Sequence, residues 1–131
     1  MLKMIMQPEG SNLCGQACVA MLLGISLDES IKLIGKRGKT RTRDLVTALK
    51  AKGCDCGTRL IRGDFIGDCI IKMTFTRTHS HWIIFYEGKF YDPSNGFNPP
   101  GILIFAKRGE YKLSSYLPIY SLPAKKIKHH A

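Results

Sequence analysis

The sequence has few acidic residues: 10 aspartates and glutamates against 20 lysines and arginines, which gives a formal net charge of +10. It lacks any apolar run near the ~18–20 residues of a membrane-spanning helix. Its apolar start, Met1–Met6, is ended by Gln7 and Pro8 too soon for a signal peptide. We therefore expect a cytoplasmic chain without a membrane span. The charge excess indicates an acidic partner or only solubility.

Cysteine patterns that would indicate a disulfide framework or a zinc ribbon are also missing. The five cysteines are an odd number, in C-x3-C and C-x-C spacings and without a C-x2-C pair. Cys14, Cys18, His79 and His81 could be drawn as four zinc ligands, so a zinc-stabilised interaction domain stays the weakest alternative. The leading expectation is a protein with no metal and no cofactor.

The composition is that of one ordinary globular domain, since 44% of the 131 residues are hydrophobic and 23% are charged. The first half has helical periodicity, and we expect helices over residues 13–23, 27–34 and 41–52. Ser11 or Asn12 should cap the first helix. Cys54 and Cys56 follow the third helix in a turn that we expect to be solvated.

The second half has β periodicity. We expect strands over residues 58–62, 69–75, 81–86, 89–92 and 102–105. Glu87 and Gly88 should join two of them as a hairpin. Helices followed by an antiparallel sheet predict an α+β fold with a helical lobe at 12–53 and a sheet lobe at 57–123. We thus expect one domain over residues 1–123 and a basic tail over 124–131.

Four side chains fall where thiol hydrolysis would need them. Cys14 starts a helix, where unpaired N–H groups and the helix dipole favour a thiolate. His81 begins a strand and could act as the base, and Asp92 on the next strand could orient its imidazole if a bulge or a longer loop corrects the register. Gln7, in the loop before the helix, could donate its amide to an oxyanion.

Other residues could fill the same roles. Cys18 is the rival nucleophile, one helical turn further on, and His79 is the rival base, with the same strand parity as His81. Asn95 could replace Asp92 as the orienting residue, since an aspartate before proline can also serve only to open a turn.

These residues lie in stretches that resemble a known family. Gln7, Cys14-Gly15-Gln16-Ala17-Cys18, His81-Trp82-Ile83-Ile84 and Tyr91-Asp92-Pro93 resemble papain-like cysteine peptidases, and most closely their bacteriocin-leader (C39-type) branch. The resemblance covers about residues 5–95. It implies a papain-like fold with a cleft between the two lobes. It also implies that Cys14 is the nucleophile, His81 the base, Asp92 the orienting residue and Gln7 the oxyanion donor.

The expected function is therefore a cysteine peptidase that acts on a peptide or protein substrate. A deamidase or an acyltransferase would use the same site with a different acceptor. The main alternative is a non-catalytic module, because five of the eight residues from 36 to 43 are basic and could bind nucleic acid or another acidic partner.

Overall fold

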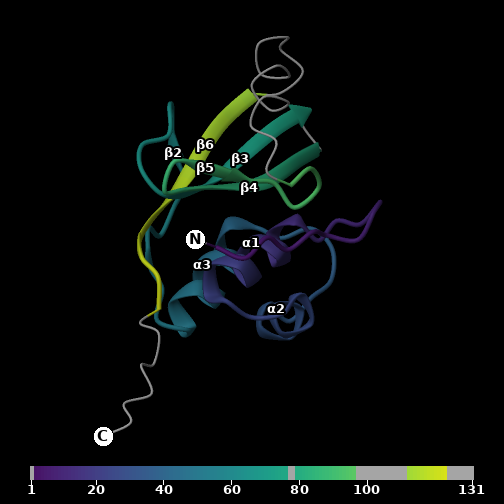
Figure 1. The fold of residues 1–131 in the computed structure, drawn as a ribbon. Helices are drawn as coiled ribbons and strands as arrows, with labels where there is room; N and C mark the ends of the chain where they lie inside the picture. Colours follow the sequence, from purple (N-terminus) through teal and green to yellow (C-terminus); the bar gives the residue numbers. More distant parts are fainter. Residues whose placement is uncertain (1, 77–78, 97–111, 124–131) are drawn as a thin grey trace, which may run out of the picture.

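The computed structural model describes residues 2–76, 79–96 and 112–123 (Figure 1). Its helices are α1 (Cys14–Leu23), α2 (Leu27–Ile34) and α3 (Thr42–Ala51). Its strands are β1 (Asp55–Cys56), β2 (Ile61–Arg62), β3 (Cys69–Thr76), β4 (His79–Tyr86), β5 (Lys89–Tyr91) and β6 (Lys112–Ser121). Figure 1 shows the three helices gathered on one side of the sheet. The expected α+β organisation, with helices first and an antiparallel sheet after them, is confirmed.

The sheet has the strand order β1-β6-β3-β4-β5, with β2 also paired to β6, and every pairing is antiparallel. Strand β6, which has partners on both sides, was not predicted; Pro118 lies inside it, and proline normally argues against a strand paired on both sides. The carbonyl of Pro118 accepts a hydrogen bond from Gly57 at 2.9 Å. The expected strand at 102–105 and the tail at 124–131 lie outside the described residues.

The helix boundaries follow local capping chemistry in α2 but not in α1. Ser26 accepts a hydrogen bond from the backbone of Glu29 at 3.0 Å and completes a capping box. The N-cap of α1 is instead Leu13, which makes no side-chain capping bond, so the prediction that Ser11 or Asn12 caps this helix is wrong. Within the described part of the chain, no helix has the length and apolar character to cross a membrane.

The main core lies between the helices and one face of the sheet. Residues 15–22 of α1 are all buried, and α1 contacts α2, α3 and β4. Cys54 and Cys56 are each only 2% exposed, because β1 pairs with β6 and turns both side chains into this core. The expectation of a solvated turn there is wrong. The buried helix α1 fixes Cys14, at its open end, against the start of β4.

Gly15 provides a test of how closely α1 packs against the loop that precedes α3. A Cβ atom at this position would lie 2.0 Å from Oγ1 of Thr40 and 3.2 Å from Cδ2 of Leu45. We expect Gly15→Ala to lower the free energy of unfolding by ~1–3 kcal/mol, the usual cost of overpacking. Urea unfolding at constant m-value measures it. Adding Thr40→Ala should restore part of the loss, and full stability of Gly15→Ala alone would contradict the packing.

Candidate active site

Cys14 is the first residue of α1 and the start of the site. The helix begins without a side-chain cap, so its first backbone N–H groups remain free to face a negative group. Burial raises the pKa of the Cys14 thiol, and the neighbouring backbone N–H groups of Trp82 and Gly15 are among the groups that lower it. Cys14 is partly exposed, whereas Cys18, one turn further along α1, is fully buried.

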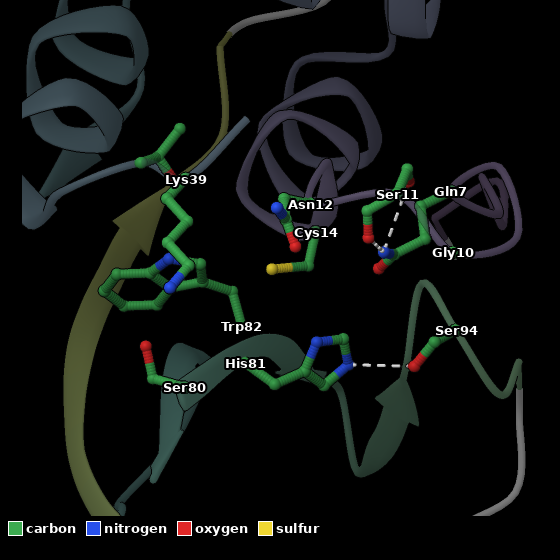
Figure 2. A pocket seen from close by; sticks show the side chains of 11 residues that line it. Gln7, Gly10, Ser11, Asn12, Cys14, Lys39, Ser80, His81, Trp82 and Ser94 are labelled. Carbon is green, nitrogen blue, oxygen red and sulfur yellow. Dashed lines mark hydrogen bonds between the residues drawn. The ribbon is translucent and has the colours of Figure 1, made fainter. Parts of the chain in front are cut away.

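The imidazole of His81 faces this sulfur from the start of β4. Against the effect of burial, His81 lowers the pKa of the Cys14 thiol, and Nε2 of the same ring lies 2.7 Å from Oδ1 of Asp92. Figure 2 shows the other ring nitrogen turned toward the sulfur of Cys14. The structure thus brings together the three side chains that the sequence singled out on α1, β4 and the end of β5, with one imidazole between a thiol and a carboxylate.

The register of β4 and β5 explains how His81 reaches Asp92. Ile84 lies opposite Tyr91 and Phe85 opposite Phe90, without a bulge, so the expected bulge is absent from this pair of strands. His81 and Asp92 are therefore diagonal neighbours, a separation that long side chains span. The Asp92 carboxylate is almost completely buried and is held in place from the opposite side by the turn that follows it.

Ser94 is a member of the site that the sequence did not reveal. Its backbone N–H and its hydroxyl both lie 2.9 Å from Oδ1 of Asp92, and its hydroxyl oxygen lies 3.1 Å from Nε2 of His81. Figure 2 shows this hydroxyl beside the imidazole. The signal for it was a serine two residues after an aspartate in a turn, a common Asx-type arrangement. Asn95, the alternative orienting residue, is exposed and donates its backbone N–H to the carbonyl of Asp92.

The charges of this group are coupled. Burial raises the pKa of the Cys14 thiol. Hydrogen bonding to His81 and the positive charge of its ring lower this pKa, and the backbone N–H groups of Trp82 and Gly15 lower it further. Together they outweigh burial and hold the pKa below 9.0. Burial lowers the pKa of His81, but Asp92 and Cys14 raise it to about 9. Burial raises the pKa of Asp92, but His81 and Ser94 outweigh this and hold the pKa below its ordinary value. These shifts favour the charged form of each of the three groups, a thiolate beside an imidazolium and a carboxylate.

The other cysteines have the opposite shifts. Burial, with the negative charges of Cys14 and Asp92, raises the pKa of Cys18 well above its ordinary value. Burial raises the pKa of Cys54 and of Cys69 to about 12. A thiolate is the reactive form of cysteine, so these residues have the character of structural thiols.

Gln7 lies on the same side of Cys14 as Ser94 (Figure 2). Its backbone N–H donates to the carbonyl of Pro93 at 2.8 Å, which ties the loop before α1 to the end of β5. Its Nε2 donates to the Ser11 carbonyl at 2.8 Å and lies 3.4 Å from the Ser11 hydroxyl. The side-chain amide of Gln7 has two N–H bonds. One donates to the Ser11 carbonyl, and the other makes only the longer contact with the Ser11 hydroxyl.

A pocket of about 420 Å³ opens over the Cys14 sulfur. Gln7 lines it from the segment before α1, His81 and Trp82 from β4, and Ser94 from the turn after β5. Lys39 and Thr40 line it from the loop before α3. Three buried side-chain atoms among the described residues have no hydrogen-bond partner, and they belong to Gln7, Gln16 and Thr40. Such unpaired groups are uncommon and ask for an explanation. Gln7 and Thr40 line the pocket, which therefore carries unused hydrogen-bonding capacity, whereas Gln16 is fully buried in α1.

Among the described residues, no group of three or more histidine, cysteine, aspartate or glutamate side chains could hold a metal ion. His79 lies on β4, and its side chain falls outside what the structure describes.

No protein-family model matches this chain, and no curated protein matches it.

Proposed function

We propose that this chain is a cysteine hydrolase of the papain-like kind that cleaves peptide bonds with Cys14 as its nucleophile. The observation that supports it most is the placement of the His81 imidazole between the Cys14 thiol, which it faces in Figure 2, and Asp92, whose Oδ1 lies 2.7 Å from Nε2 of the ring. An activated nucleophile, a base and a residue that orients the base are the three parts of such a site. A nucleophile on a buried helix and a base on a neighbouring sheet also suit the two-lobed papain-like fold.

In the proposed reaction the Cys14 thiolate attacks the carbonyl carbon of a peptide bond, and the carbonyl electron pair moves to its oxygen. The backbone N–H of Cys14 and the amide of Gln7 stabilise this oxyanion. The carbon–nitrogen bond then breaks, and the proton of the His81 imidazolium goes to the leaving amine. A water molecule, deprotonated by His81, attacks the thioester and releases a carboxylic acid and the thiolate. Asp92 and Ser94 hold the ring in place throughout.

Alkylation by iodoacetamide tests the activated thiol and needs no peptide substrate. Near pH 6 we expect Cys14 to react at least ~10-fold faster than Cys18, Cys54 or Cys69, because only its pKa is lowered. Peptide mapping by mass spectrometry after timed quenching measures each rate.

The matched control is His81→Ala, which removes the positive charge but leaves the helix start intact. In this variant the Cys14 rate should fall near pH 6 and recover at alkaline pH, where the thiol ionises unaided. Equal rates for Cys14 and Cys54 in the unaltered protein would rule out the proposed nucleophile.

A further inference from the structure

The basic loop, which we define as residues 36–43, forms one wall of the pocket over Cys14. Lys39 and Thr40 of this loop line the pocket. In Figure 2 the Lys39 side chain runs toward Trp82, on the opposite side of Cys14 from Gln7 and Ser94. A substrate stretched across the sulfur would therefore meet the oxyanion donor on one side and a lysine on the other.

The basic loop is fixed to the helix that carries the nucleophile. Gln16 is fully buried two residues after Cys14, and its Nε2 donates to the carbonyls of Lys36 at 3.1 Å and Gly38 at 2.9 Å. At the other end of the loop, Asp44 accepts from Lys36 and from the backbone of Arg41, both at 2.7 Å. A loop held at both ends positions Lys39 in advance, so little ordering is needed on binding.

The pocket is also positive. Lys39 is its one permanently charged lining residue among the described residues, and no carboxylate of that part of the chain lines it. His81 adds a second positive charge when it is protonated, and the Asp92 carboxylate that balances it is buried behind the ring. Exposed arginines at positions 37, 41 and 43 extend the same sign along the loop, in a chain of net charge +10. Such a field attracts anionic groups toward the sulfur.

We propose that Lys39 gives this site a preference for peptides with an aspartate or glutamate side chain beside the cleaved bond. This inference rests on the proposed function and names its substrate class. An acidic peptide fits better than a nucleic acid, because nucleic-acid sites offer aromatic faces for stacking. Trp82 is the one aromatic residue that lines the pocket from the described chain, and at 3% exposed it offers no such face.

Two small reagents test the inference at the sulfur itself. Iodoacetate is an anion and iodoacetamide is its neutral analogue, so the ratio of their rates with Cys14 reports the local charge. We expect Lys39→Gln to lower this ratio about threefold to tenfold, as the loss of one charge several ångströms away would, and Lys39→Glu to lower it further. High salt should shrink the difference. The matched control for Lys39→Glu is Lys52→Glu, the same change of net charge at the exposed C-terminal end of α3, and it should leave the ratio unchanged.

The peptide preference is measured on fluorogenic peptides that differ only in glutamate, glutamine or lysine next to the cleaved bond. The unaltered protein should prefer glutamate at least ~10-fold in kcat/KM, and Lys39→Glu should prefer lysine at that position instead. If neither reagent labels Cys14 faster than Cys54, the proposed function fails. If both reagents label Cys14 rapidly but the ratio is the same in Lys39→Gln, only the inference about Lys39 fails.

A protection experiment separates the two kinds of acidic partner. A glutamate-rich peptide should protect Cys14 from iodoacetamide in the unaltered protein and lose this effect in Lys39→Glu. Protection by single-stranded DNA, without protection by the peptide, would assign the basic loop to nucleic acid and overturn the inference.

Discussion

Replacement of Cys14 by alanine should abolish peptide hydrolysis, with kcat/KM falling by at least ~10³-fold. The reason is chemical: without the sulfur there is no thioester, and water would have to attack the peptide bond directly. Cys14 is the helix residue whose sulfur faces the His81 ring in Figure 2, and the neighbouring thiol of Cys18 is fully buried and cannot substitute for it. Cleavage of a degenerate peptide mixture, followed by mass spectrometry, measures the activity across many peptide sequences at once.

Cys18→Ala is the matched control for this prediction, since it removes the rival nucleophile on the same helix. Cys18 is fully buried and its pKa is raised by burial, so its loss should cost some stability but leave kcat/KM within a fewfold of the unaltered value. Activity that survives in Cys14→Ala and disappears in folded Cys18→Ala would reverse the assignment. Circular dichroism and urea unfolding establish that both variants are folded.

The helices and the hairpin were predictable because their signals are local. The capping box at Ser26 lies within one turn of chain, and the turn at Glu87 and Gly88 fixes which residues of β4 and β5 face each other. The hairpin in turn places His81 near Asp92, so part of the site followed from spacing alone. Local signals failed for β6, where Pro118 normally acts as a strand breaker and only pairing with β1, β2 and β3 decides the outcome.

The remaining parts of the site depend on contacts between distant segments. Nothing in the spacing of Gln16 and Gly38 predicts a buried amide that holds the basic loop, because that contact forms only once α2 has turned the chain back on α1. The same contact brings Lys39 to the pocket. Part of the positive net charge therefore lies at the candidate site. A basic stretch is usually a solvated face, whereas here one of its lysines lines the space over the proposed nucleophile.

Loss of the Asp92 charge should have the second-largest effect, because this carboxylate keeps His81 protonated in a buried place. Burial lowers the pKa of His81, and Asp92 and Cys14 together raise it to about 9. Asp92→Asn removes the carboxylate charge that raises the pKa of His81. Burial, which lowers this pKa, then has less to oppose it, so the pKa of His81 should fall. We expect kcat/KM near neutral pH to drop by ~10²–10⁴-fold, the range seen when the orienting residue of such a site is lost.

The pH profile distinguishes this mechanism from simple misfolding. The active form exists above the pKa of Cys14 and below the pKa of His81, so activity should decline through about pH 9 in the unaltered protein. In Asp92→Asn this alkaline limb should move to lower pH and the acid limb to higher pH, because a less charged imidazole no longer holds the thiol pKa down. Asn95→Ala, on the same turn, is the control that should leave both limbs in place. An alkaline limb unmoved in Asp92→Asn but shifted in Asn95→Ala would transfer the orienting role to Asn95.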